Sequence, residues 1–223
     1  MRTSVRIFLG SVGLLGIGLL VYDLKLDAVF RKGEYTKPFY DYKSLNFRGF
    51  DRIRLNSATT LSFLLVQGDY KVVVNPRLRT WLRVRQEGSK LIITADLPES
   101  FDGFTNDYAV FISCPNLRGV ETSGKYFVKG EAVVDRRGPN FWFNPTMIAG
   151  FRSDSLEISE DGGGNLALRN DRLGILQAVV GNRTALRVGS DNVIGGGEIS
   201  VGDSATLILN GVAAKQLLKL KQP

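Results

Sequence analysis

A repeat of about 20 residues in the C-terminal half is the feature that most constrains how this chain folds. Each repeat joins a turn rich in Gly, Asn and Asp to a short run of alternating apolar residues. Equivalent leucines fall at Leu166, Leu186 and Leu207, so the spacing is 20 residues and then 21. Apolar residues at spacing two are typical of β-strands, and a short fixed period lets each coil bury its apolar row against the next. The repeat therefore predicts a β-solenoid.

Strand patterns also fill the earlier part of the body, from Phe47 onward. The aligned turn-and-strand segments of the repeat are 161–168, 181–188 and 202–209, and intermediate strand patterns lie at 156–158, 175–179 and 199–201. Before the repeat, alternation runs through 53–55, 61–65, 70–74, 82–84 and 108–112. A short helical turn is predicted at 76–81, and no other segment between Phe47 and Ala205 has the period of an amphipathic helix.

Two glycine triplets, 162–164 and 195–197, invite comparison with phosphate-binding loops. Such a loop needs a helix N-terminus directly after it, whereas strand patterns follow both triplets. We therefore predict that both triplets are corner turns of the solenoid.

The chain has no histidine and a single cysteine, Cys114. It therefore holds no Ser-His-Asp or Cys-His triad, no His-ligated metal and no intrachain disulfide. Chemistry based on carboxylates or on Lys and Arg remains open. Cys114 is interpreted as a small packed residue at a strand end.

The N-terminus carries an uncharged run at 7–22, preceded by Arg2 and Arg6. Counted from Ser4 to Leu24, it is long enough to approach the thickness of a bilayer core. We favour an uncleaved anchor, with a cleaved signal peptide as the alternative. The positive residues place the N-terminal end in the cytoplasm, so the prediction is a single-pass membrane protein, held in the lipid bilayer by residues 4–24, with its C-terminal domain in the periplasm or outside the cell.

Several segments of the body follow one another in a characteristic order. They are 50–55 (FDRIRL), 66–74 (VQGDYKVVV), 91–93 (LII), 110–117 (VFISCPNL), 120–124 (VETSG) and the later turn 161–168 (DGGGNLAL). In this order they resemble the putative auto-transporter adhesin family with the head GIN domain, over about residues 47–212.

The resemblance implies an all-β domain, a right-handed parallel β-helix-like solenoid with an N-terminal strand region, in the cell envelope of Bacteroidetes-type bacteria. It carries over no catalytic, metal-binding or cofactor-binding residues. The chain departs from the family in an aromatic insertion at 138–150 and in having a membrane anchor in place of a lipoprotein cysteine. We divide the chain into an anchor (1–26), a linker (27–46), the GIN-like domain (47–212) and a basic tail (213–223).

The aromatic insertion supplies the first candidate binding residues, Phe141, Trp142 and Phe143, next to Arg136 and Arg137. Exposed rings beside arginines suit stacking against a sugar or docking of a partner protein. The alternative is that the rings cap one end or face of the solenoid.

Arg83 and Arg85 are the second candidates, because alternate residues of a strand share one face. They suit contact with anionic lipid headgroups or acidic glycans, and the alternative is an exposed face that keeps the strand soluble. Residues 1–37 hold six of the 29 basic residues and three of the 22 acidic residues, so the rest of the chain has 23 basic and 19 acidic residues, a net charge of +4 out of the total of +7. This charge is too small to predict nucleic-acid binding.

The sequence thus predicts an adhesin-like envelope protein that binds or scaffolds and catalyses nothing, with no cofactor and no metal. A glycan or an envelope protein is the expected partner, and the oligomeric state stays open. One alternative is a carbohydrate-active enzyme or glycan-binding module on the same solenoid, with Asp102, Asp107 and Asp135 as the candidate acids. Another is a subunit of an envelope assembly that docks through the patch around Trp142.

Overall fold

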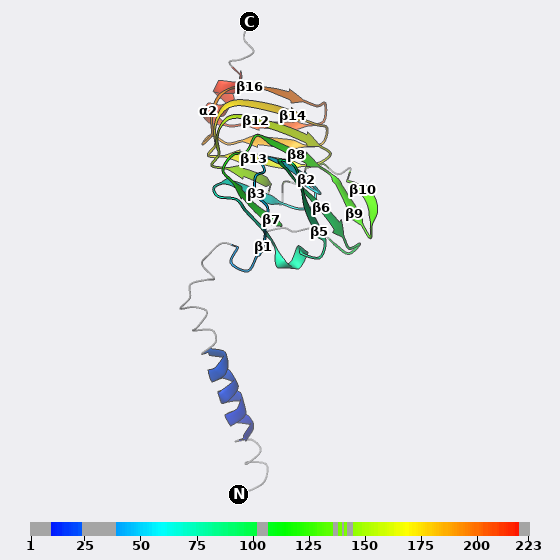
Figure 1. Ribbon diagram of the computed structural model, residues 1–223, viewed down its shortest axis with the longest axis vertical. Coiled ribbons are helices and arrows are strands. Elements are labelled where there is room, and N and C mark those ends of the chain that lie inside the picture. Colours follow the sequence, from blue (N-terminus) through cyan, green and yellow to red (C-terminus); the bar gives the residue numbers. More distant parts are fainter. Residues whose placement is uncertain are drawn as a thin grey trace. The chain divides into compact units, whose positions relative to one another are not determined.

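A computed structural model describes residues 10–23, 39–101, 107–135, 138–139, 141 and 145–218 (Figure 1). The chain separates into two compact units, one up to Asp41 and one from Tyr42 onward. The second unit holds the β-strands and the short helix α2 (Gly211–Leu218).

In the first unit, residues 10–23 form a helix. Its exposed large apolar side chains are those of Val12, Leu14, Leu15, Ile17, Leu19, Leu20, Val21 and Tyr22. Among the residues that the structure describes, no helix combines the length and the apolar character of a membrane span. The predicted bilayer segment 4–24 continues past this helix at both ends into residues outside the described ranges, so the anchor remains a prediction.

The strands of the second unit form two sheets. Sheet A contains, in spatial order, β1 (Lys43–Leu45), β4 (Lys71–Val74), β7 (Val110–Cys114), β3 (Phe63–Gln67), β11 (Thr146–Ala149), β13 (Asn165–Arg169), β15 (Ala185–Val188) and β17 (Thr206–Leu209). Sheet B contains β10 (Glu131–Val134), β9 (Lys125–Val128), β6 (Lys90–Leu97), β2 (Arg52–Asn56), β8 (Gly119–Ser123), β12 (Arg152–Asp161), β14 (Arg172–Val180) and β16 (Val193–Val201), and β5 (Leu82–Glu87) pairs with β6 beside this path. The short helix η2 (Pro76–Leu78) lies within the predicted helical turn.

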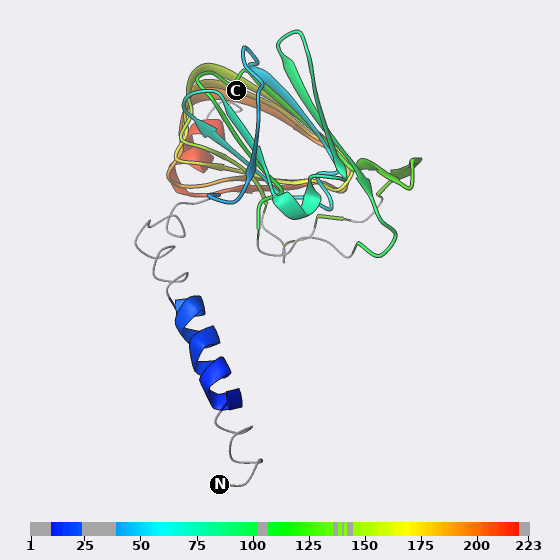
Figure 2. The same ribbon diagram turned by 60° about the horizontal axis from the view of Figure 1, so that its bottom comes forward.

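From β11 to β17 the chain alternates between the two sheets, and each strand pairs in parallel with the equivalent strand one coil later. Leu166 lies opposite Leu186, and Leu186 lies opposite Leu207, so the register predicted from the repeat is confirmed. Figure 2 shows these yellow to red strands overlying one another.

The core lies between the sheets and consists of rows that cross the strands. On sheet A one row is Leu65, Ile148, Leu168 and Val188, and on sheet B one row is Val120, Ile158 and Ala178. All of these residues are buried. Each buried Leu, Ile or Val contributes roughly 1.5–3 kcal/mol relative to an exposed one, so the aligned rows stabilise the stack. Cys114 is also buried, which raises the pKa of its thiol to about 12 and agrees with a packing role.

The ends of the stack lie in segments that the sequence assigned to a linker and a tail. Strand β1 pairs with β4 at one edge of sheet A. At the other end α2 lies beside β16, where Ala213 and Leu217 are buried and the side chain of Gln216 accepts a hydrogen bond of 3.0 Å from the backbone of Ile194. The folded unit therefore takes in residues on both sides of 47–212.

The all-β class of this unit is confirmed, whereas a regular β-helix over the whole of 47–212 is not. The pairs β1–β4, β4–β7, β5–β6 and β9–β10 are antiparallel, and the two sheets do not close on one another. Parallel in-register pairing is not confined to the repeat, since it also joins β3 to β7, β2 to β8, β2 to β6 and β6 to β9. The right-handed β-helix stays a prediction.

The two glycine triplets have different roles. Gly162 and Gly163 take positive φ angles of 72° and 86° in the turn between β12 and β13, so the first triplet is a corner as predicted. The second triplet lies inside strand β16, and its assignment to a corner was wrong. A Cβ atom on Gly197 would overlap the carbonyl oxygen of Leu176, so this glycine permits close approach of β14 and β16.

Substitution of this strand glycine tests the close approach. We expect Gly197→Ala to lower the free energy of unfolding by roughly 1–3 kcal/mol, because the added methyl group must displace backbone in a packed sheet. Gly138→Ala is the control, since a Cβ atom there meets nothing within 4 Å. Urea unfolding followed by circular dichroism measures both, and equal losses in the two variants would contradict the packing account.

Candidate functional site

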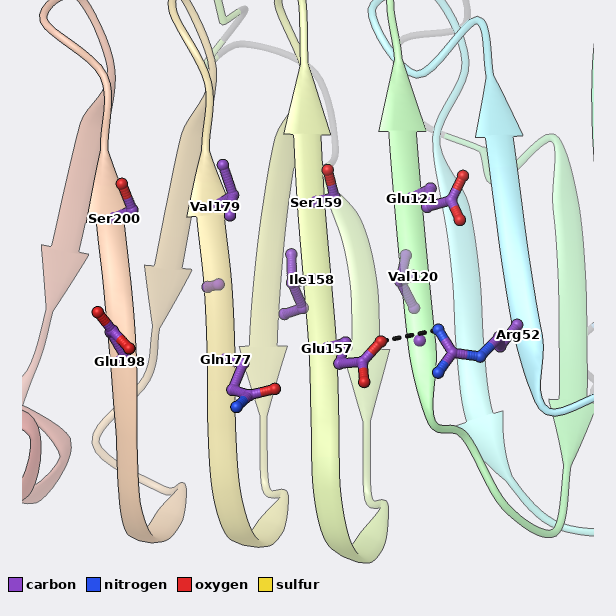
Figure 3. Close-up of a pocket in the computed structure, with 12 residues that line it drawn as sticks. Arg52, Val120, Glu121, Glu157, Ile158, Ser159, Gln177, Val179, Glu198 and Ser200 are labelled. Atoms are coloured by element: carbon purple, nitrogen blue, oxygen red, sulfur yellow. Dashed lines mark hydrogen bonds and ion pairs between the residues drawn. The ribbon is translucent and has the colours of Figure 1, made fainter.

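A groove of about 490 Å³ lies on the outer face of sheet B (Figure 3). It crosses β2, β8, β12, β14 and β16, whose outward side chains form its floor. Because these strands are parallel and in register, equivalent residues of successive coils line up across them. The lining residues are Arg52, Gly119, Val120, Glu121, Glu157, Ile158, Ser159, Gln177, Ala178, Val179, Glu198 and Ser200.

Two outward rows give the groove its character, and Figure 3 shows both. We call them the amide row, which contains Arg52, Gly119, Glu157, Gln177 and Glu198, and the hydroxyl row, which contains Glu121, Ser159, Val179 and Ser200. Their members come from neighbouring strands at matching register positions. The groove is therefore a regular array of hydrogen-bonding groups.

The Arg52 side chain spans two strands to reach Glu157. Its Nη1 atom lies 2.7 Å from Oε2 of Glu157, and Gly119 stands between the two in the row. A Cβ atom on Gly119 would approach the Arg52 guanidinium to 3.0 Å, so the glycine leaves room for this crossing. The hydrogen bond to Arg52 lowers the pKa of Glu157, and the same bond raises the pKa of Arg52.

Glu121 in the hydroxyl row is also held by cations. Its carboxylate lies 2.6 Å from Nζ of Lys90 and 3.0 Å from Nε of Arg54. Exposed pairs of this kind add little to stability. Their effect is on the groove, where they hold two carboxylates in place beside cations.

A second pocket, of about 620 Å³, adjoins the groove and shares Arg52 and Glu157 with it. Its other lining residues are Asn116, Arg118, Arg152, Ser153, Asp154, Ser155 and Arg172. We call it the arginine pocket. It lies on the outer face of the same sheet, toward the beginnings of β12 and β14.

The three candidate catalytic acids lie outside both pockets or outside the described residues. Asp107 is exposed, Asp135 is buried and neither lines a pocket, while Asp102 falls among residues that the structure does not describe. Within the described ranges, His, Cys, Asp and Glu side chains form no group of three or more that would hold a metal ion. The acids of the groove are Glu121, Glu157 and Glu198, and Gln177 lies between Glu157 and Glu198 in the amide row.

Of the predicted aromatic binding residues, only Phe141 is described. Its ring is 48% exposed, and the guanidinium carbon of Arg187 lies 4.6 Å from the ring centroid. The other four predicted residues of this patch, Trp142, Phe143, Arg136 and Arg137, lie outside the described residues. Phe141 lines neither pocket.

Arg83 and Arg85 lie on β5 as expected, at alternate positions of an exposed face. Each is paired with an acid: Nη2 of Arg83 lies 2.9 Å from Oδ2 of Asp96, and Arg85 pairs with Glu87. Neither arginine lines the groove or the arginine pocket. A ligand would have to compete with these intrachain partners.

The sequence patterns used above did not predict the groove residues, although these residues follow the same repeat as the core leucines. Glu157, Gln177 and Glu198 follow one another at spacings of 20 and 21, the same as the core leucines. Their polar character hid the period, because only apolar positions were aligned.

Comparisons with known proteins come from solved structures alone, since no protein-family model and no curated protein sequence matches the chain. A putative lipid binding protein from Parabacteroides distasonis is 16% identical, with 76% of this chain and 94% of that chain covered and a TM-score of 0.36. A putative adhesin from Bacteroides fragilis is 10% identical, with 77% and 96% covered and a TM-score of 0.38. A putative adhesin from Parabacteroides merdae is 14% identical, with 77% and 93% covered and a TM-score of 0.29.

These names agree with the adhesin-like expectation, and none of them is the name of an enzyme. No finding confirms the GIN domain. Because each TM-score is below 0.5, the likenesses support no inference about ligand or activity.

One acid of β12, Glu160, lies inside the fold. Its position alternates with Glu157, so it points to the core, where it is 2% exposed and neither carboxyl oxygen has a hydrogen-bond partner among the described residues. Its neighbour across the strands is Thr122, whose hydroxyl is also buried and unpaired. Burial raises the pKa of Glu160 to about 8.

The buried carboxyl makes stability depend on pH. The unfolded chain loses this proton near the ordinary pKa of 4.5, whereas the folded chain keeps it up to about 8. Stability therefore falls as the pH rises between these values and stays reduced above them. We expect Glu160→Gln to remove this fall, so that its stability relative to wild type grows by up to about 1.4 kcal/mol per pH unit across the window.

Urea unfolding at several pH values across the window measures this difference. Burial also raises the pKa of Asp171, to about 7, but Asp171 is common to both proteins and cancels in the comparison. Glu157→Gln on the same strand is the control, since its exposed carboxyl has a lowered pKa and should show no such gain. Parallel pH profiles for wild type and Glu160→Gln would contradict the assignment.

Proposed function

We propose that this chain is a membrane-anchored envelope protein with an adhesin-like, non-catalytic role, whose β-helical coils bind a polyhydroxylated ligand, a polysaccharide strand, along the groove of sheet B. The observation that carries the proposal is the pair of outward rows. A flat array of donors and acceptors, repeated from strand to strand, suits a ligand with repeated hydroxyl groups.

The centre of the groove has hydrogen-bonding capacity to spare. Within the described part of the chain, the side chains of Gln177, Glu198, Ser159 and Ser200 make no hydrogen bond to another residue. Amides and hydroxyls both donate and accept, which matches the two roles of a sugar hydroxyl. Val179 lies between the two serines at 55% exposure and offers apolar surface to the C–H face of a ring.

The acids of the groove are arranged for binding and not for hydrolysis. A glycosidase needs one carboxyl that is protonated and one that is ionised, facing each other across the bond to be cleaved. Glu157 is held ionised by Arg52, and Glu121 is held by Lys90 and Arg54. Ion-paired carboxylates make poor proton donors. Glu198, which has no ion pair with a described residue, is separated from Glu157 by the whole of strand β14 with Gln177, so binding without turnover is the better interpretation.

The anchor in this proposal rests on the helix at residues 10–23. Its exposed large apolar side chains would be unfavourable in water, and a bilayer accommodates them. The described helix spans about 21 Å at ~1.5 Å per residue, and the apolar run of the sequence extends it toward bilayer thickness. Arg2 and Arg6 favour a cytoplasmic N-terminus, which would place the groove outside the cytoplasm.

The anchor is tested by introducing charge into the helix. We expect the full-length chain to sediment with membranes, and Leu15→Lys combined with Ile17→Lys to release it, because each buried lysine costs about 2.5–3.5 kcal/mol at the centre of a bilayer. Leu15→Ile with Ile17→Leu is the matched control and should remain in the membrane. Fractionation of a bacterial host with an alkaline wash measures this, and a soluble wild-type chain would refute the anchor.

The groove is tested by removing its free polar groups. We expect Gln177→Ala with Glu198→Ala to weaken polysaccharide binding at least tenfold. Each lost hydrogen bond costs about 1 kcal/mol, and about 1.4 kcal/mol in total corresponds to a tenfold loss of affinity. Ser44→Ala with Glu131→Ala removes exposed polar groups on β1 and β10 and serves as the control. The measurement is binding to immobilised pullulan, galactan, polygalacturonate and methyl-esterified polygalacturonate. Failure of all four polymers to bind, or equal binding by both variants, would refute the groove as the site.

A further inference from the structure

We propose that the arginine pocket is a subsite for an oxyanion carried by the polysaccharide, so that the ligand of this protein is an acidic glycan. This inference rests on the proposed function, because it names the chemical class of the ligand bound in the same groove. The anchoring residues are Arg152 and Arg172, with Arg118 at the edge of the pocket.

The pocket and the groove form one surface. They share Arg52 and Glu157, so a strand lying along the amide row reaches the arginines without leaving the sheet. Arg152 and Arg172 occupy equivalent positions of neighbouring coils and face each other in register on β12 and β14. Parallel strands lie about 4.8 Å apart, so two guanidinium groups start from adjacent points on one face.

The charges of this pocket are not balanced by ion pairs among the described residues. Arg52 is paired with Glu157, and Arg118 has its Nε atom 3.5 Å from Oδ2 of Asp51. Arg152 and Arg172 form no ion pair with any described residue, although Asp154 lines the same pocket. Like charges directly opposite each other across two strands are destabilising. An oxyanion held between them removes this repulsion.

Arg152 and Arg172 are exposed on the outer side of sheet B, directly before a break in the alternation of β14. On β14 the buried residues Leu173 and Leu176 are three apart, so the alternation shifts at Gly174. A Cβ atom on Gly174 would lie 2.5 Å from the carbonyl oxygen of Asp154, and one on Gly195 would lie 2.8 Å from that of Gly174. Glycine is therefore needed where the neighbouring strands approach closely at this break, and Arg152 and Arg172 are exposed beside it.

The chemistry of the pocket favours carboxylate or sulfate on a sugar over a phospholipid headgroup. Guanidinium groups donate two parallel hydrogen bonds to the planar oxygens of a carboxylate. The other lining groups are polar, among them Asn116, Ser153 and Ser155, and they suit the hydroxyls beside such a group. Acyl chains would need an apolar cavity, and the arginine pocket does not provide one, since all of its lining residues are polar or charged.

The test compares one polymer with and without its charge. Polygalacturonate and its methyl ester have the same backbone, and the full-length chain in detergent micelles is titrated with each. We expect wild type to bind the acid at least tenfold more tightly than the ester. Arg152→Gln with Arg172→Gln should weaken the acid at least tenfold and leave the ester within about twofold.

Arg77→Gln with Arg79→Gln is the matched control, because it removes two exposed arginines of η2 and its C-terminal cap, which line neither pocket. It should change binding of either polymer by less than about twofold. Equal losses in the two double variants would show that net charge alone attracts the polymer, and this would overturn the subsite.

The failures of the two proposals are distinguishable. If acid and ester both bind, and only Gln177→Ala with Glu198→Ala weakens them, the arginine subsite is wrong and the glycan groove stands. If no polymer binds, both proposals are wrong. If the chain then binds anionic vesicles, and Arg152→Gln with Arg172→Gln abolishes that binding, the ligand is a lipid surface and the glycan assignment is overturned.

A second readout does not depend on the choice of polymer. Without ligand, Arg172→Gln should raise the melting temperature at low ionic strength, because it removes the repulsion with Arg152, and the gain should vanish at high ionic strength. Arg79→Gln should show no such gain. A fall in melting temperature for Arg172→Gln at low ionic strength would mean that the chain already neutralises this arginine, and it would overturn the unbalanced-charge argument.

Discussion

In-register parallel pairing between successive coils governs both faces of this domain. Pairing Leu156 with Leu176 and Ile158 with Ala178 completes the buried rows of sheet B. Because side chains alternate along a strand, the same pairing sets Glu157 beside Gln177 and Gln177 beside Glu198 on the outside. A slip of one residue would bury the polar rows and expose the core rows, so the burial that selects the register also positions the groove.

Two glutamates of β12 have opposite pKa shifts because they lie on opposite faces of sheet B. Glu157 and Glu160 are three residues apart, yet one is exposed against a guanidinium and the other is buried beside a threonine. Pairing with Arg52 lowers the pKa of Glu157, and burial raises the pKa of Glu160 to about 8. The outward acid is thus a fixed charge available to the ligand site, whereas the inward one lowers the stability of the fold at high pH.

Periodicity was a sound guide wherever the apolar rows were long enough to be seen. The leucine spacing gave the correct pairing of β13, β15 and β17. The antiparallel pairs β1–β4 and β4–β7 could not be predicted in this way, because the partners lie far apart in sequence and no period links them. The triplet 195–197 was placed in a corner because a glycine that turns the chain and a glycine that admits a neighbouring backbone look alike in sequence. Glu160 could have been found, since it continues the alternation of Leu156 and Ile158 into the core.

The absence of histidine separates ligand binding from proton binding in this protein. Histidine is the side chain whose ordinary pKa falls in the physiological range, and this chain has none. The described groups whose pKa values are moved toward that range are Glu160, at about 8, and Asp171, at about 7, and both are buried away from the groove. The outer face of sheet B carries arginines and ion-paired carboxylates, and the pair with Arg52 lowers the pKa of Glu157. Under the proposed function, the groups that would contact an acidic polymer are therefore separate from the two buried acids with raised pKa values, and the cost in stability of a rising pH falls on the core.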